Sequence, residues 1–297
     1  MPAKLIDGKA LAATIKEDIK KEVEGLKSKH KMTPKLVSVQ VGENPSSEVY
    51  LKSQRKNAED LGIDYHIEKL AEEASQDDLV RAIDKLNKDK GVNGIIVQMP
   101  LPSHIDAKSV PRYILPAKDV EAVHPQNMGE IVFGNAKVLP CTAVACMEIL
   151  DSIEGLKLYG KEAVVVGHSE IVGKPLALLL LNRFVTTTVC HIATGERGDL
   201  PEFVKKAEIL IVAVGKAGLV KGEWIKQGAI VIDVGINRVE GKLVGDVEFE
   251  KAQERASYIT PVPGGVGPLT VAMLMRNLVE AFKIQKSEDR RQKKSDL

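Results

Sequence analysis

The chain has few cysteines, few aromatic residues and almost no net charge. Its 297 residues include three cysteines, and aromatic side chains make up 4%. Three cysteines, an odd number with no Cys-x-x-Cys pair, predict neither a disulfide framework nor a cysteine-based zinc site, and we predict no metal site. The 42 Lys and Arg are balanced by 41 Asp and Glu, which argues against a dedicated nucleic-acid binder.

The sequence also lacks a segment typical of a signal peptide or a membrane span. Residues 1–9 are charged and run into an amphipathic stretch at residues 10–26, where a signal peptide would have an apolar core. The longest apolar run, residues 176–181, falls far short of the roughly 20 residues that span a bilayer and is typical of a buried helix. We therefore expect a cytoplasmic protein without a membrane partner.

Short apolar runs alternate with longer amphipathic stretches along most of the chain. This alternation is typical of βαβ units around a parallel sheet that is covered on both faces. We predict an α/β protein of two domains, because each domain would have roughly 150 residues. The predicted strands lie at residues 36–41, 94–98, 163–166, 187–190, 209–214 and 229–234, and the predicted helices at residues 46–61, 75–88 and 269–282.

Two breaks in this pattern predict the domain boundaries. The first lies near Leu139-Pro140, after a loop-rich stretch, and the second lies at Pro-Val-Pro-Gly-Gly-Val-Gly-Pro, residues 261–268. We expect an N-terminal α/β catalytic domain at residues 1–140 plus 269–297, with the C-terminal helix returning to it, and a Rossmann-like cofactor domain at residues 141–268. The polar and charged residues 283–297 predict a frayed, solvated end.

A glycine turn follows the predicted strand at residues 163–166. Gly167-His168-Ser169 leads into an apolar helix, an arrangement in which backbone N–H groups and the helix N-terminus can hold a pyrophosphate. Ser169 replaces the second glycine of G-x-G-x-x-G, so the spacing alone leaves dinucleotide binding and a plain βα turn both open. Two further predicted strands end in glycine, at Gly215 and Gly235, which favours a ligand at this edge.

The residues themselves leave NAD and NADP both open. NAD enzymes often carry an acid about 20 residues after the glycine loop, but here that region reads Cys190-His191-Ile192. An NADP enzyme would place a basic residue near the 2′-phosphate, and the nearest candidates are His168 and Arg197. His168 is equally well interpreted as a neutral loop residue.

Three further groups of polar residues fall in the first half of the chain. Tyr50 and Gln54 share one helix face, Gln98 ends a predicted strand before Met99-Pro100, and Lys118-Asp119-Val120-Glu121 places carboxylates in a loop. Each has a simple structural interpretation: a half-buried helix tyrosine, a capped strand end and a solvated acidic turn.

Taken together and in order, these segments resemble the bifunctional methylenetetrahydrofolate dehydrogenase/cyclohydrolase family. The similar segments are VGENPSSEVYLKSQRKNAEDLGI, GIIVQMPLP, KDVEAVHPQNMG, LPCTAVACMEIL, VVVGHSEIVGKP, VAVGKAGLVKGEWIKQGAIVIDVGINR and YITPVPGGVGPLTVAMLM. A series of this kind covers nearly the whole chain and is far more specific than any single motif.

The resemblance implies a homodimer in one-carbon metabolism whose two-domain protomer holds a folate in a cleft. Family members oxidise 5,10-methylenetetrahydrofolate by hydride transfer to NADP, or in some cases NAD. Most then hydrolyse the methenyl product to 10-formyltetrahydrofolate. On the matching positions, Tyr50 would stack on the folate and Gln98 would orient the hydrolytic machinery. The implied substrate contacts are Tyr50, Gln54, Val97, Gln98, Met99, Pro263, Gly264, Gly265, Val266 and Gly267, and the implied cofactor contacts are Gly167, His168, Ser169, Ile192 and Ile236.

The chain departs from the family pattern at three places. The family has a lysine, regarded as central to hydrolysis, where this chain has Gln54; its Lys-Asp-Val-Asp-Gly becomes a segment ending in Glu121-Ala122, and its Cys-Thr-Pro-x-Gly becomes residues 141–145. Lys52 and Lys56 lie roughly 200° and 240° around the helix from Tyr50, so neither substitutes for that lysine.

These departures lead to a hypothesis about activity. Hydride transfer depends mainly on positioning, whereas hydrolysis requires a group that carries protons near neutral pH. We therefore expect dehydrogenase activity with weak or absent cyclohydrolase activity, with Tyr50, Gln54, Gln98 and Glu121 as the catalytic set. Three alternatives stay open: a dehydrogenase for another pterin one-carbon carrier, a non-catalytic folate- or nucleotide-binding paralogue, and full bifunctionality through another residue.

Overall fold

The computed structural model describes residues 2–295, and the chain folds as two compact units. Unit 1 combines the residues up to Thr14 with Pro140–Thr270, and unit 2 combines Ile15–Leu139 with the segment that starts at Val271. Each unit has a parallel sheet flanked by helices, which confirms the predicted α/β fold class. Two long helices, α1 (Gly8–His30) and α10 (Val266–Ser295), contribute residues to both units.

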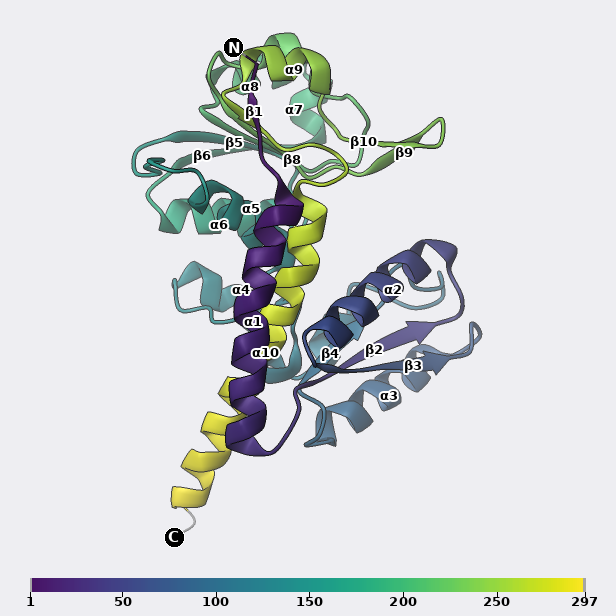
Figure 1. Cartoon of the computed structure of the whole chain (residues 1–297). Coiled ribbons are helices and arrows are strands. Elements are labelled where there is room, and N and C mark those ends of the chain that lie inside the picture. Colours follow the sequence, from purple (N-terminus) through teal and green to yellow (C-terminus); the bar gives the residue numbers. More distant parts are fainter. Residues whose placement is uncertain (1, 296–297) are drawn as a thin grey trace. The chain divides into compact units, whose positions relative to one another are not determined.

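Unit 2 is built on a sheet of three parallel strands with β2 in the centre. The strands, in spatial order, are β3 (Asp64–Leu70), β2 (Lys35–Val41) and β4 (Gly94–Val97). The helices α2 (Pro45–Asp60) and α3 (Gln76–Lys88) connect them (Figure 1). The strand β3 was not predicted, because the exposed and half-buried residues of this edge strand lack an apolar run.

The two faces of β2 differ in chemistry. Val37, Val39 and Val41 pack with Leu79 and Ile83 of α3 in one apolar cluster. The alternate residues Ser38 and Gln40 point to the opposite face, which α2 covers, and both are buried. A buried polar face on a central strand costs stability unless its groups find partners, so this face is where a functional site is expected.

The remaining elements of unit 2 support this sheet. Ser75 caps α3 in a reciprocal capping box with Asp78. Along the chain, β4 is followed by η1 (Val110–Tyr113), η2 (Pro116–Lys118) and α4 (Pro125–Val132), all of which belong to unit 2. In unit 2, α1 and α10 run side by side (Figure 1), joined by an ion pair of 2.7 Å between Lys283 and Glu22.

The C-terminal segment differs from its prediction. The expectation of a frayed end at residues 283–297 is wrong for the described part, because α10 continues as one helix to Ser295. Lys, Glu, Arg and Gln are good helix formers, and a helix that is already nucleated by a packed segment adds residues at little cost. Asp296 and Leu297 lie outside the described residues.

Unit 1 is a six-stranded sheet in which every neighbouring pair of strands is parallel. The strands, in spatial order, are β1 (Lys4–Leu5), β11 (Tyr258–Ile259), β8 (Ile230–Asp233), β7 (Ile209–Val212), β5 (Glu162–Val166) and β6 (Thr186–Cys190). The strands β1 and β11 were not predicted, since two-residue strands have no periodicity to detect.

Helices cover this sheet, and a two-stranded hairpin extends from it. The helices are α5 (Cys141–Asp151), α6 (Gly173–Asn182), α7 (Ile192–Glu196), α8 (Leu200–Lys206), η3 (Gly222–Trp224) and α9 (Phe249–Arg255), and the hairpin strands are β9 (Asn237–Val239) and β10 (Lys242–Val244). Among residues 2–295, no helix has both the length and the apolar character needed to cross a bilayer.

Candidate functional site

A network of neutral polar side chains lies between α2 and the sheet of unit 2. Gln54, on α2, is 0% exposed. Its Oε1 accepts hydrogen bonds from the hydroxyl of Tyr65 at 2.9 Å and from Nε2 of Gln98 at 3.2 Å. Gln98 also donates through Nε2 to Oγ of Ser38 at 2.6 Å. The structure therefore brings the predicted residues Gln54 and Gln98 into direct contact.

Several buried polar atoms of this unit lack partners in the described part of the chain. They include Nε2 of Gln54 and both amide atoms of Gln40. A buried donor without an acceptor is costly, so these atoms mark a place where a ligand or water can bind.

The two lysines nearest to Gln54 in sequence point away from this network. Lys52 and Lys56 are both exposed, whereas Gln54 is buried and Tyr50 is half-buried. The helical angles derived from the sequence thus agree with the side-chain exposures. Neither lysine therefore supplies the network with the ammonium group that a lysine at position 54 would bring.

The loop that carries Lys118 and Asp119 is buried, so its interpretation as a solvated acidic turn is wrong. Nζ of Lys118 donates to the backbone oxygens of Leu86 and Asp89 at 2.8 and 2.7 Å, which commits it to a structural role. Asp119 accepts hydrogen bonds from the backbone N–H of His124 and the side chain of Asn127. Even so, burial raises the pKa of Asp119.

Glu121 is the second carboxyl group of this loop whose pKa is raised. Burial, with the nearby charge of Asp119 added to it, raises the pKa of Glu121 to about 8, so this carboxyl is mostly neutral at pH 7 and can donate a hydrogen bond. The adjacent Ala122 adopts a φ of +56°, a left-handed conformation that favours glycine. Nδ2 of Asn277, on α10, donates to the backbone oxygens of Val120 and Leu139 and so anchors the loop.

The carboxyl edge of the sheet in unit 1 forms a crevice. From β5 the chain goes first to β6 on one side and then to β7 on the other, so β5 and β7 meet at a topological switch point, where such sheets bind ligands. Gly167 follows β5 with a φ of +125°, and a Cβ there would collide with the backbone oxygen of Ala213. A Cβ on Gly173 would likewise collide with the backbone oxygen of Gly167.

This crevice contains a pocket of about 700 Å³. Four of the predicted cofactor residues line it, Gly167, His168, Ser169 and Ile192. His191 lines the pocket too, and its ring centroid lies 5.5 Å from that of His168. The backbone cradle and the volume fit a dinucleotide.

Ile236, the fifth predicted cofactor residue, does not line this pocket. It is 61% exposed and lies beside Gly267, where an added Cβ would be 3.9 Å from its Cδ1. Pro263, Gly264 and Gly265 form the turn before α10 in the same unit, and Val266 and Gly267 begin that helix. The segment at residues 141–145 forms the buried first turn of α5.

Asp246 supports one wall of the pocket and was missed by the sequence analysis. Its carboxylate accepts hydrogen bonds from three consecutive backbone N–H groups, those of Val214, Gly215 and Lys216, at 2.7–2.9 Å. Burial, with a smaller contribution from the charge of Asp246, raises the pKa of Asp233 to about 6. An acid 13 residues after a strand-end Asp gave no recognisable signal in the sequence.

Ser38 and Tyr65 were missed as well. The alternation Val37-Ser38-Val39-Gln40-Val41 carried a usable signal, because a central strand with polar residues on every second position must bury them. Tyr65 gave no such signal, since β3 itself was not predicted.

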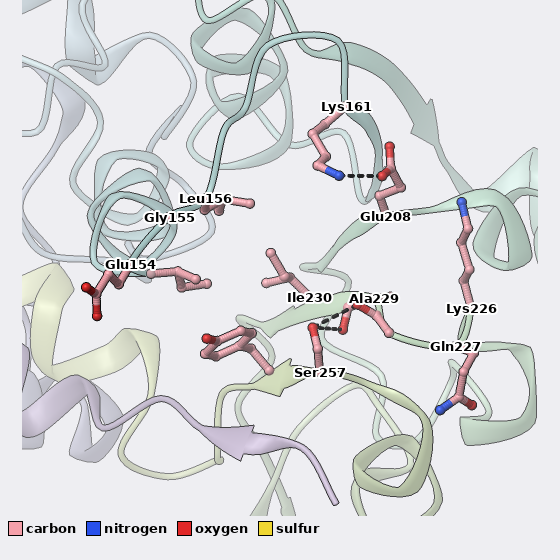
Figure 2. Close-up of a pocket in the computed structure, with 13 residues that line it drawn as sticks. Glu154, Gly155, Leu156, Lys161, Glu208, Lys226, Gln227, Ala229, Ile230 and Ser257 are labelled. Carbon is pink, nitrogen blue, oxygen red and sulfur yellow. Dashed lines mark hydrogen bonds and ion pairs between the residues drawn. The ribbon is translucent and has the colours of Figure 1, made fainter. Parts of the chain in front are cut away.

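A second cavity in unit 1 lies at the amino ends of the strands (Figure 2). It has a volume of about 330 Å³. Lys161 forms an ion pair of 2.6 Å with Glu208, and Ser257 donates to the backbone oxygens of Gly228 and Ala229. Because these polar groups have protein partners, the cavity gives no indication of a ligand. Within residues 2–295, no group of three or more His, Cys, Asp and Glu side chains is arranged to hold a metal ion.

Comparisons with known proteins match both units. The family description "Tetrahydrofolate dehydrogenase/cyclohydrolase, catalytic domain" matches residues 6–121, and "Tetrahydrofolate dehydrogenase/cyclohydrolase, NAD(P)-binding domain" matches residues 140–286. A protein of Acetivibrio thermocellus named "Bifunctional protein FolD" is 52% identical over 96% of this chain and 99% of its own length.

Solved structures agree with these sequence matches. The bifunctional methylenetetrahydrofolate dehydrogenase/cyclohydrolase of Campylobacter jejuni is 45% identical with a TM-score of 0.92, over 95% of this chain and 99% of its own. The methylenetetrahydrofolate dehydrogenase-cyclohydrolase of Trypanosoma brucei, solved with NADP and an inhibitor, is 41% identical with a TM-score of 0.90, over 95% of this chain and 98% of its own.

Proposed function

The chain belongs to the tetrahydrofolate dehydrogenase/cyclohydrolase family, and from this premise we propose that it oxidises 5,10-methylenetetrahydrofolate to 5,10-methenyltetrahydrofolate with NADP or NAD. The folate-binding catalytic domain, residues 1–140 plus 269–297, consists mainly of unit 2, although the residues up to Thr14, Pro140 and residues 269–270 belong to unit 1. The dinucleotide-binding domain, residues 141–268, lies within unit 1. The buried polar network in unit 2 and the glycine crevice in unit 1 support these two roles.

The residues of unit 2 bind and orient the folate. Tyr50 stacks on it, and Val97, Gln98 and Met99 contact it from the carboxyl end of β4. Glu121 offers a neutral carboxyl group that donates a hydrogen bond, and its raised pKa of about 8 supports this role at neutral pH. From unit 1, we propose that the turn at Pro263, Gly264, Gly265, Val266 and Gly267 also contacts the folate.

In unit 1 the crevice holds the dinucleotide. Ser169 presents its backbone N–H to the pyrophosphate in the turn that leads into α6. Gly167, whose own N–H donates to the backbone oxygen of Cys190, lets the nucleotide approach the backbone closely because it has no Cβ. His168 and Ile192 lie where the nucleotide binds, and Ile236 makes a separate contact near Gly267. When bound, the nicotinamide accepts the hydride, which needs no proton carrier from the protein.

We further propose that hydrolysis of the methenyl product is weak or absent. The observation that carries this proposal is the fully buried, neutral amide of Gln54, whose Oε1 is held by Tyr65 and Gln98. A lysine can be tuned by burial to exchange protons near neutral pH, whereas an amide can only orient water. Lys52 and Lys56 are exposed and cannot serve.

One assay tests both parts of this proposal. Purified protein is given methylenetetrahydrofolate with NADP or with NAD, reduction of the cofactor is followed, and decay of added methenyltetrahydrofolate is measured separately against the buffer rate. The expected result is cofactor reduction with methenyl decay close to the buffer rate. Rapid enzymatic decay would overturn the second part, and the absence of reduction with either cofactor would overturn the first.

We also propose that the protein acts as a cytoplasmic homodimer. The edge strand β6 supports this oligomeric state, because the exposed apolar side chains of Tyr159, Leu181 and Phe184 lie near it. All three cysteines are free and buried, which suits a reducing compartment.

A further inference from the structure

Tyr65 reaches the site from a strand that holds none of the residues assigned to the reaction above. It lies on β3, directly opposite Leu36 of β2, and therefore shares the sheet face that carries Ser38. From there its hydroxyl donates to Oε1 of Gln54 at 2.9 Å. Three polar side chains thus lie beneath α2, one for each strand of the sheet. They are Tyr65 on β3, Ser38 on β2 and Gln98 directly after β4.

This contact determines which way the amide of Gln54 faces. A carbonyl oxygen has two lone pairs, and those of Gln54 are used by Tyr65 and by Gln98. The Nε2 group must then point away from both donors. The whole side chain is 0% exposed, so Nε2 is buried with it. No acceptor in residues 2–295 reaches this Nε2 atom.

We propose that Tyr65 is a positioning residue that holds the Gln54 amide so that its NH₂ group donates to an acceptor atom of the bound folate. The inference rests on the proposed function, since it concerns the same site. Tyr65 acts through Gln54 and does not touch the reacting atoms. Its hydroxyl stays a neutral donor, because burial raises the pKa of Tyr65 against the opposing effects of Ser38 and Arg55.

The network also explains how a glutamine serves at this position. A freely rotating amide would present oxygen or nitrogen to the ligand about equally well, and half of its orientations would be wrong. Two donors on one side fix the orientation before the substrate binds, which reduces the cost of ordering on binding. The fixed group offers hydrogen bonding without proton exchange.

Tyr65→Phe tests the proposal, since it removes one oxygen atom and keeps the ring. We expect kcat/KM for methylenetetrahydrofolate to fall about tenfold, a size typical of one lost orienting hydrogen bond. The KM for the dinucleotide and the thermal midpoint should stay close to those of the wild type. Tyr113→Phe is the matched control, because Tyr113 is exposed in the same unit.

A double-mutant cycle separates positioning from simple packing. In the Gln54→Ala background, Tyr65→Phe should have no further effect, because the amide that it orients is gone. An equal loss in both backgrounds, or wild-type kinetics for Tyr65→Phe alone, would overturn the role of Tyr65.

Binding of tetrahydrofolate, measured by calorimetry on the same variants, distinguishes this inference from the proposed function. If the wild type binds tetrahydrofolate and oxidises its methylene derivative while Tyr65→Phe matches it, only the inference on Tyr65 fails. If the wild type neither binds nor oxidises a folate, the proposed function fails and the role of Tyr65 fails with it.

Discussion

At position 54 we predict that a single side chain determines whether the site can exchange protons. Gln54→Lys would place an amine in a fully buried position, where desolvation lowers a lysine pKa toward neutrality. We expect methenyl hydrolysis to increase about a hundredfold, within the range of general acid–base catalysis, while oxidation of methylenetetrahydrofolate changes less than about threefold. Both rates can be followed on the same purified variant.

Lys52→Gln is the control for this change, because it removes an exposed cation two residues away. It should alter neither rate. If Gln54→Lys changed oxidation and hydrolysis equally, Gln54 would act through general folate binding instead. Adding Glu121→Asp should increase hydrolysis further, though the two effects need not be additive if both groups contact one ligand.

Glu121 makes the stability of unit 2 depend on pH. Between the ordinary glutamate pKa of 4.5 and the folded value of about 8, the unfolded chain loses this proton while the folded chain keeps it. The free energy of unfolding therefore falls as pH rises through this window, by at most about 1.4 kcal/mol per pH unit, and this contribution levels off above pH 8.

Glu121→Gln should remove that slope, because glutamine does not titrate. Chemical denaturation at pH 5, 7 and 9 should show the variant gaining stability relative to the wild type as pH rises. Glu130→Gln, at an exposed position of the same unit, is the comparison. Parallel curves for wild type and Glu121→Gln would contradict the assignment.

At the scale of elements, Asp246 holds the turn after β7 in the shape that forms the pocket wall. Asp246→Asn replaces an acceptor oxygen with an NH₂ group that faces backbone donors, those of Val214, Gly215 and Lys216. We expect the KM for the dinucleotide to rise about tenfold or more, since two or more hydrogen bonds are disturbed, with little change in tetrahydrofolate affinity. Asp151→Asn, an exposed position in the same unit, should change neither quantity.

The elements that could be predicted from the sequence are those with strong local patterns. The apolar runs of β2, β5, β7 and β8 predicted strands within one or two residues of their observed ends. The strand β3 could not be predicted because its residues are exposed or half-buried. The strands β1 and β11 could not be predicted because they pair with each other across more than 250 residues of chain.

The candidate site shows the same limit more sharply. Tyr50, Gln54 and Gln98 could be named from helical spacing, a strand end and family resemblance. The contact between Tyr65 and Gln54 could not, because it depends on the register that sets Tyr65 opposite Leu36. The left-handed backbone of Ala122 was not predicted either. The family pattern has a glycine at this position, which was the one signal for it.

At the scale of the whole molecule, the edge strand β6 predicts self-association. Tyr159 and Phe184 are 78% and 72% exposed, with ring centroids 5.5 Å apart. Phe184 also adopts a φ of +58°, a strained conformation for a bulky residue. An exposed aromatic pair beside an unpaired strand edge is a surface that a second copy of the chain would cover.

Phe184→Asn tests this surface without endangering the fold, because asparagine tolerates a left-handed backbone better than phenylalanine. Light scattering should give twice the chain mass for the wild type and a shift toward one chain mass for Phe184→Asn. At dilutions where the wild type is also monomeric, the thermal midpoint of the variant should equal or exceed that of the wild type. Phe133→Asn, which removes a phenylalanine that is 78% exposed in unit 2, should leave the mass unchanged. A wild type that stays monomeric at high concentration, or a Phe184→Asn variant that stays dimeric, would exclude β6 as the contact.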